Sequence, residues 1–164
     1  QLDGVALVTA LDTPNDTARD LIHRLLIWDD QKSKQAIAPL KKLIRHAEAH
    51  PKARAQALSI LEGLNAVDLE DLKVAFKDSH AGVRENALRV SETNNATAEV
   101  LEAVETLSAD SDAKVQLQLA FSLGAWTQPE AGRALAKLLP LGTKENPWLQ
   151  AAIMSSARGQ NRTK

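Results

Sequence analysis

Residues 78–88 read DSHAGVRENAL, and residues 112–124 read DAKVQLQLAFSLG. Each segment opens with short polar side chains that are typical of a turn, and each then places an apolar residue before a long polar one, Val83-Arg84 and Val115-Gln116. The apolar residues that follow recur at three- and four-residue spacing, which predicts an amphipathic helix. The two segments therefore predict one structural unit, a turn followed by a helix, that is used twice.

Three further segments repeat this pattern, at Ala18-Arg19, Ala53-Arg54 and Leu149-Gln150. We call the five apolar members the anchor residues, and they recur at intervals of 35, 30, 32 and 34 residues: Ala18, Ala53, Val83, Val115 and Leu149. Such a period is typical of helical repeat proteins, in which each unit buries its apolar side against the next.

Another amphipathic stretch lies before each anchor residue, with apolar residues over 5–11, 37–44, 69–76, 100–107 and 135–139. We therefore expect helix pairs, each made of a first helix, a polar turn and a second helix that carries the anchor residue. The approximate repeats are 1–30, 34–65, 66–94, 95–127 and 128–160, which gives four complete pairs and a short opening one. The period-2 alternation of strands is absent from the sequence.

Capping and breaking residues mark the expected helix ends. Thr13-Pro14 and Asn146-Pro147 each pair a capping side chain with proline at the first helical position, and Asp68 is placed to cap the helix that follows it. Pro140 followed by Gly142 predicts the end of the last first helix, because proline blocks continuation and glycine accepts a left-handed turn.

The segments 78–88 and 112–124 together resemble HEAT repeats, and the resemblance covers nearly the whole chain. More narrowly, the chain resembles the HEAT segment of large exported bacterial proteins, common in planctomycetes, that are described as membrane-bound dehydrogenases. In those proteins the segment bridges a β-propeller of the sugar-dehydrogenase type and a c-type cytochrome domain. The resemblance implies an all-α fold, a right-handed α-α superhelix (HEAT/armadillo-like solenoid) of about four to five helix pairs, and a periplasmic or exported location.

The chain departs from that pattern in two ways. Thr17 stands where the family resemblance implies a large aromatic residue, and the sequence contains no cysteine and hence no C-x-x-C-H motif. Covalent haem attachment and thiolate metal sites are therefore excluded from these residues. Any dehydrogenase or electron-transfer activity is expected to lie in domains outside this segment, and we expect no cofactor here.

Charge and hydropathy limit the kinds of partner that the chain can bind. The formal net charge is -1, which does not favour nucleic acid as a partner, and residues 65–110 carry four Lys/Arg against ten Asp/Glu. Residues 111–164 carry seven Lys/Arg against three Asp/Glu, so the charge changes sign along the chain. No run of about 18 apolar residues occurs, and we expect no direct membrane insertion.

Three sets of residues are candidates for a chemical site. His46 and His50 have the spacing of a metal pair on one helix, but Pro51 places His50 at a helix end, so helix-terminal histidines are the preferred interpretation. The serines Ser59, Ser91, Ser155 and Ser156 lack a nucleophile elbow and are interpreted as small packing residues. Gly124 lies inside an apolar run and predicts a close helix contact or a bend.

The polar residues beside the anchors form the most informative row, Arg19, Arg54, Arg84, Gln116 and Gln150. Because they recur at one repeat position, they either bond to turn carbonyls of the preceding repeat or to acidic caps such as Asp78, or they form a polar line that faces a partner. We prefer the first interpretation and keep the second open.

Large aromatic and acidic residues complete the candidates. Trp28, Trp126 and Trp148 fall near helix ends and predict core or edge packing, with Trp148 also placed to pack on a further repeat or domain. Glu99, Glu102 and Glu105, alongside Glu70 and Asp71, predict a solvated acidic face, with docking to a basic surface as the alternative.

The sequence therefore predicts a non-catalytic scaffold or protein-protein interaction module within a larger, possibly exported redox protein, whose partner is another protein or an adjacent domain of the same polypeptide. Two alternatives stay open: a nucleic-acid-binding HEAT-like array, and a HEAT-like lyase that acts on a protein-bound chromophore. Both rest on fold-level analogy.

Overall fold

The computed structural model describes residues 2–93 and 97–160. The described residues form ten α-helices and two short 3-10 segments, with no strand among them. The all-α fold class predicted from the sequence is therefore confirmed. The expected first-helix stretches 5–11, 37–44 and 69–76 lie within α-helices, whereas the stretches 100–107 and 135–139 each begin in an α-helix and end in a 3-10 segment. The opening pair contains two α-helices.

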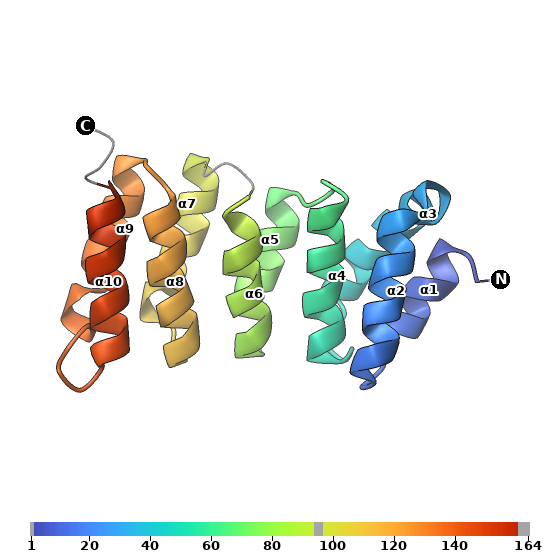
Figure 1. Cartoon of the computed structure of the whole chain (residues 1–164), viewed down its shortest axis with the longest axis horizontal. Coiled ribbons are helices and arrows are strands. Elements are labelled where there is room, and N and C mark those ends of the chain that lie inside the picture. The colour runs from blue at the N-terminus through green and yellow to red at the C-terminus, as the bar shows by residue number, and fades with distance from the viewer. Residues whose placement is uncertain (1, 94–96, 161–164) are drawn as a thin grey trace. The chain divides into compact units, whose positions relative to one another are not determined.

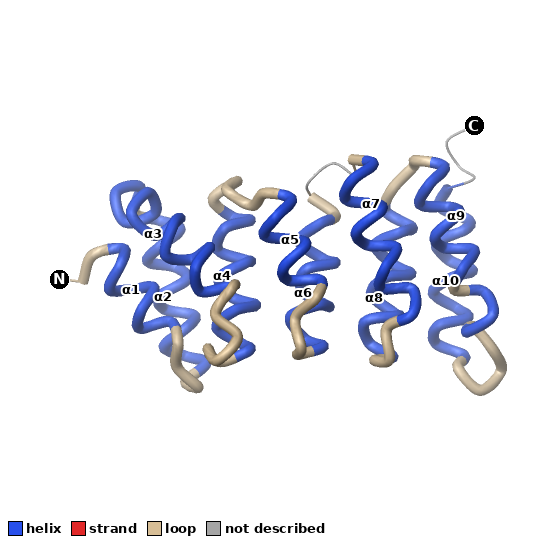
Figure 2. Tube along the Cα trace, turned by 180° about the vertical axis from the view of Figure 1, so that it is seen from behind, coloured by secondary structure: helices blue, strands red, loops and turns tan. Residues whose placement is uncertain are grey.

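Helices divide between two units, residues 1–87 and residues 88–164, and the division falls inside α6. The first unit contains α1 (Gly4–Leu11), α2 (Asp16–Trp28), α3 (Asp30–Ile44), α4 (Pro51–Gly63), α5 (Leu69–Phe76) and the start of α6 (Ala81–Ser91). In Figure 1, α2 and α4 face the viewer, and the reverse view in Figure 2 brings α1, α3 and α5 to the front. The contacts of α1 with α3, α3 with α5, and α2 with α4 build this unit as two layers.

The second unit contains the end of α6 together with α7 (Ala98–Glu105), α8 (Ala113–Ala125), α9 (Pro129–Lys137) and α10 (Pro147–Gln160). Two 3-10 segments, η1 (Thr106–Ala109) and η2 (Leu139–Leu141), follow α7 and α9. First helices pack together as α7 and α9, and second helices pack together as α8 and α10. Figures 1 and 2 show these two layers from opposite sides.

The anchor residues lie on the second helices α2, α4, α6, α8 and α10. Ala53 and Val115 are fully buried, Val83 and Leu149 are 1% exposed, and Ala18 on α2 is half-buried. A position that recurs in every pair and is buried in four of them is what a repeated packing unit requires.

Side chains three residues before the anchors cap most of the second helices. Asn15 accepts a hydrogen bond from the Ala18 amide at 3.1 Å, so α2 begins at Asp16. The prediction that this helix begins at Thr13-Pro14 is wrong. The capping residue is Asn15, two residues after Thr13, and its side chain accepts from a free amide of the first helical turn. The cap by Asp68 is confirmed, as its side chain and that of Asp71 bond each other's backbone amides at 2.9 and 3.2 Å.

The exit from α9 also differs from the prediction. Gly142 has φ -81°, so it does not take a left-handed turn, and the chain leaves through the 3-10 segment that contains Pro140. Asn65, which follows α4, has φ 51°. Asparagine tolerates this region better than most residues, because its short polar side chain can bond to the nearby backbone.

Gly124 makes the close helix contact that the sequence predicted. A Cβ atom built on Gly124 of α8 would lie 2.5 Å from the Cβ of Ser156 on α10. Real Cβ atoms do not approach so closely, so a side chain at residue 124 would push the two second helices apart. This contact fixes α8 against α10 within the second unit.

Candidate functional site

An open groove crosses the second helices of the first unit and reaches Asn86 on α6. It encloses about 620 Å³ and runs over α2 and α4, which face the viewer in Figure 1. The lining is polar and carries both charge signs: Asp16, Arg19, Asp20, His23, Lys52, Ala55, Gln56, Ser59 and Asn86. We call this surface the α2–α4 groove.

Side chains of α4 bond to side chains of α2 across the groove. The Lys52 Nζ lies 3.2 Å from both carboxylate oxygens of Asp16, and both side chains are more than half exposed. Such a pair adds little stability in water, so its charges stay available to a partner. The Gln56 amide donates to Asp20 at 3.3 Å and lies 3.2 Å from His23 Nδ1.

His23 is shifted toward its neutral form. Partial burial lowers the pKa of His23, because burial disfavours the charged imidazolium, and the Asp20 carboxylate raises it by a smaller amount. A neutral ring can accept the Gln56 amide hydrogen at Nδ1. Uncharged as well as charged side chains therefore connect α2 and α4 across the groove.

Asn86 makes the equivalent connection between α6 and α4. Its Nδ2 donates to the Ala55 carbonyl at 3.0 Å and to the Ser59 hydroxyl at 3.1 Å. Ser59 in turn donates to the same Ala55 carbonyl at 3.3 Å. These bonds hold α4 and the start of α6 at a fixed spacing inside the first unit.

A third carboxamide does the same in the second unit. Gln118 on α8 donates to Glu92 at 3.0 Å and to Ser122 at 3.2 Å, and Ser122 donates to Glu92 at 2.6 Å. Gln56, Asn86 and Gln118 each lie three residues after an anchor, and we call them the carboxamide row. Sequence reasoning missed this row, although its 30- and 32-residue intervals matched the anchors and could have revealed it.

The residues directly after the anchors bind turn carbonyls. Arg19 donates to the Thr13 carbonyl, Arg84 to the Asp78 carbonyl at 2.8 Å, and Gln116 to the Asp110 carbonyl at 2.6 Å. In each case the acceptor lies six residues earlier, in the turn that precedes the same second helix. The expectation of carbonyls from the preceding repeat is corrected accordingly, because a long side chain in the first helical turn reaches back along its own chain.

Arg54 also bonds to a neighbouring pair. Its Nε and Nη2 donate to the two Asp78 carboxylate oxygens at 2.7 and 2.8 Å, and its Nη1 donates to the carbonyls of Ala47, at 2.9 Å, and Ala49. Burial alone raises the pKa of Asp78, but the hydrogen bonds from Arg54 and from the His80 amide outweigh it and hold that pKa below its usual value. The bond to Asp78 is the one that the sequence suggested.

The structure places the remaining predicted interaction residues at the surface. Gln150 is exposed on α10, and Trp148 is 78% exposed at the start of that helix. Trp28 is 79% exposed, so the prediction of core or edge packing is wrong for this residue, because no described segment covers that face of α2. Trp126 is 5% exposed and packs in the core as predicted.

The histidine and serine candidates have local structural roles. His50 caps α4 through its Nδ1, which accepts from the Lys52 amide at 3.2 Å, while His46 lies in the turn after α3. Among the side chains that the structure describes, no group of three or more His, Cys, Asp or Glu is placed to hold a metal ion. The Ser91 hydroxyl donates to the Leu88 carbonyl at 2.6 Å.

Asp71 does not belong to a solvated acidic face. It is fully buried, and its carboxylate lies 2.9 Å from Lys41 Nζ and 2.8 Å from an Arg45 guanidinium nitrogen, both at the end of α3. The predicted face is therefore wrong at this residue, because its carboxylate serves as a capping group and an ion-pair partner. Glu99 and Glu102 are exposed on α7, and Glu105 pairs with Lys137 of α9.

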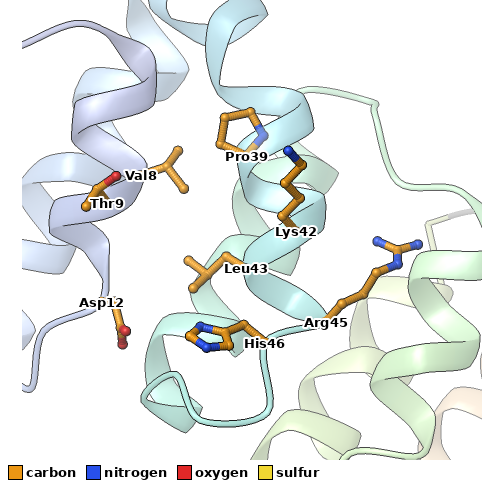
Figure 3. Close-up of a pocket in the computed structure, with 8 residues that line it drawn as sticks. All are labelled: Val8, Thr9, Asp12, Pro39, Lys42, Leu43, Arg45 and His46. Carbon is orange, nitrogen blue, oxygen red and sulfur yellow. The ribbon is translucent and has the colours of Figure 1, made fainter.

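A second depression lies in the other layer of the first unit, between α1 and α3. Figure 3 shows Val8 and Leu43 pointing toward each other there, with Asp12 and His46 at one end. The Asp12 carboxylate accepts from the His50 amide at 2.8 Å, which joins the turns of the first two pairs. We use this surface below as a reference for the α2–α4 groove.

Comparison with protein-family models, with curated proteins and with solved structures finds no match to the chain. Within residues 2–93 and 97–160, no helix combines the length and the apolar character that crossing a membrane requires.

Proposed function

We propose that the chain is a non-catalytic protein-interaction or scaffold module, built as a right-handed HEAT-like solenoid of paired helices within a larger polypeptide. The observation that supports this most is the α2–α4 groove, which is open, polar and of mixed charge. Its walls are second helices whose spacing is set by the carboxamide row. A surface with fixed spacing and exposed charges suits recognition of another chain, because little ordering is needed on binding.

An extended protein segment is the partner that best fits this groove. Such a segment presents backbone amides and carbonyls along its length, together with charged side chains. Asp16 and Asp20 on one wall and Lys52 on the other can pair with charges of either sign. The partner is either a separate protein or an adjacent domain of the same polypeptide.

Nucleic acid suits the groove less well. A polyanion requires clustered Lys and Arg side chains, whereas Arg19 in the groove donates to the Thr13 carbonyl and to Asp16 and is 2% exposed. Asp16 and Asp20 would repel phosphates. Under the proposal, any redox chemistry of the larger protein, as well as its export, belongs to other segments.

The test compares two charge reversals that differ in the surface they alter. Lys52→Glu changes the α2–α4 groove, and Lys42→Glu changes the depression between α1 and α3; both lysines are exposed. Proteins that the wild-type chain captures from cells of its source are identified by mass spectrometry, purified, and titrated against all three forms by calorimetry.

For a true groove partner, Lys52→Glu is expected to weaken binding at least about tenfold, because an interfacial charge reversal costs more than 1.4 kcal/mol. Lys42→Glu is expected to leave the affinity unchanged. If every purified partner binds Lys52→Glu as well as the wild type, or is lost only with Lys42→Glu, the groove is not the interaction site and the proposal fails.

A further inference from the structure

Two of the second helices begin with a histidine whose ring bonds to the helix. The Nδ1 of His50 accepts from the Lys52 amide of α4 at 3.2 Å, and the Nδ1 of His80 accepts from the Gly82 amide of α6 at 3.1 Å. Both histidines lie three residues before an anchor, the position that Asn15 occupies before α2. We call these two contacts the histidine caps. Unlike asparagine, histidine can gain a proton between pH 5 and pH 8.

The geometry of each histidine cap requires a neutral ring. The amides in the first turn of a helix have no partner within that helix, so the ring nitrogen supplies the acceptor. An imidazolium ring carries a hydrogen on both nitrogens and accepts none. Its positive charge would also lie at the positive end of the helix dipole. Protonation of a capping ring therefore removes the bond and repels the start of the helix.

Both capping rings lie at one open depression of the first unit. His50 and His80 line it together with Glu48 and Ser79, and it encloses about 400 Å³. The His80 side chain is exposed and the His50 side chain is half-buried. Water can therefore deliver a proton to either ring while the chain stays folded.

The charged residues around the two rings do not replace the lost bonds. Those that bond to either histidine or line the same depression carry both signs: Asp12, Glu48, Lys52, Arg54 and Asp78. Asp78 is already bound by two nitrogens of Arg54. Asp12 and Glu48 are exposed, so water screens their attraction for an imidazolium. Lys52 and Arg54 repel it.

We propose that the histidine caps are an acid-sensitive switch, in which protonation of His50 and His80 releases the first turns of α4 and α6. Because protonation costs two caps, acid lowers the stability of the folded chain. Helix α4 also carries Lys52, Gln56 and Ser59 of the α2–α4 groove, so the switch acts on a helix that forms that groove. Imidazoles gain a proton as the pH falls through about 6.5, so the test spans pH 7.5 to pH 5.

Urea unfolding at these two pH values, followed by circular dichroism, tests the switch. The acid response is the factor by which the unfolding equilibrium constant rises from pH 7.5 to pH 5. The double variant His50→Asn with His80→Asn keeps two capping side chains but cannot gain the protons. Its acid response should be at least about fivefold smaller than that of the wild type, because the loss of even one cap changes an equilibrium constant by about this factor. His46→Asn is the matched control, because His46 lies in the turn after α3 and not at a helix start; it should keep the wild-type acid response.

A second double variant separates capping from other roles of the rings. His50→Ala with His80→Ala removes both caps at every pH. It should therefore raise the unfolding equilibrium constant at pH 7.5 at least about fivefold, and it should share the small acid response of the asparagine variant. The asparagine variant should be at least as stable as the wild type at pH 7.5, because asparagine is among the strongest capping residues.

Hydrogen exchange measured by mass spectrometry locates the change within the chain. Protection in the wild type, corrected for the intrinsic pH dependence of exchange, should fall between pH 7.5 and pH 5 at the starts of α4 and α6. The start of α8 is the internal control. Asp112 caps that helix by accepting from the Lys114 amide at 2.8 Å, and carboxylates titrate below this pH range.

Equal acid responses for the wild type and the asparagine variant would overturn the proposal. So would an alanine variant that is as stable as the wild type at pH 7.5, since the rings would then not act as caps. Protection that falls as much at the start of α8 as at α4 and α6 would also overturn it, because acid would then act on the whole chain. All of these measurements use the chain without a partner, so their outcomes are independent of the proposed function.

Discussion

Replacement of Arg54 by methionine tests whether the buried arginine holds two helix pairs together. The Arg54 and Asp78 side chains are only 3% and 8% exposed, so solvent screens their interaction little. Removing one partner of a buried pair leaves the other charge without compensation and costs about 3–5 kcal/mol. The carbonyls of Ala47 and Ala49 also lose a donor. We therefore expect Arg54→Met to lower the free energy of unfolding by about 3 kcal/mol or more.

Urea unfolding at pH 7, followed by circular dichroism at 222 nm, measures this loss. The control is Arg133→Met, because the Arg133 side chain is 71% exposed and its pair with Glu130 should contribute less than about 0.5 kcal/mol. A double variant that combines Arg54→Met with Asp78→Asn removes the uncompensated charge, so it should recover about 1 kcal/mol or more of the lost free energy of unfolding. If Arg54→Met costs no more than Arg133→Met, the buried pair does not stabilise the fold as argued.

Two further predictions follow from the described contacts. The folded state lowers the pKa of Asp78, so the contribution of this carboxylate to stability is complete above the unfolded carboxyl pKa and is lost as pH falls through the lower folded value. The urea midpoint of the wild type should therefore fall more steeply below about pH 4 than the midpoint of Arg54→Met. Parallel curves for the two proteins would contradict this. Gly124→Ala should destabilise the chain by about 1–3 kcal/mol, because the added methyl group meets the Ser156 backbone. Gly63→Ala is the control, because its methyl group meets only the flexible end of the Ile27 side chain. Equal melting temperatures for the two variants would refute the close contact at Gly124.

The helices and their order could be read from the sequence because the apolar period is strong and local. The anchor residues recur with the same neighbours, and the Asp68 cap depends only on residues three positions apart. The contact at Gly124 could also be predicted, because a glycine inside an apolar helical run has few other uses. Helix starts were less certain: Thr13 and Asn15 are both capping residues, and only the backbone path selects Asn15.

The polar contacts between pairs were harder to predict because they depend on which residues meet in space. In the sequence, Asp71 cannot be told apart from an exposed acidic residue. It is buried as the ion-pair partner of Lys41 and Arg45, which lie a whole pair earlier in the chain. The carboxamide row is polar and half-buried, so it leaves no mark in the hydrophobic pattern. The exposure of Trp28 depends on what packs beyond α2, which the pattern within a pair does not specify.

The polar ties described above have a consequence for how the chain loses its structure. Side-chain bonds within a pair reach back about one helical turn and a half, and the bonds from Arg54 to Asp78 and from His50 to Asp12 span 24 and 38 residues. Such short loops close quickly, so the chain is suited to rapid folding that starts in any pair. Because these bonds join residues of one pair or of two neighbouring pairs, a whole pair could be inserted or deleted by recombination while the bonds inside the others are preserved.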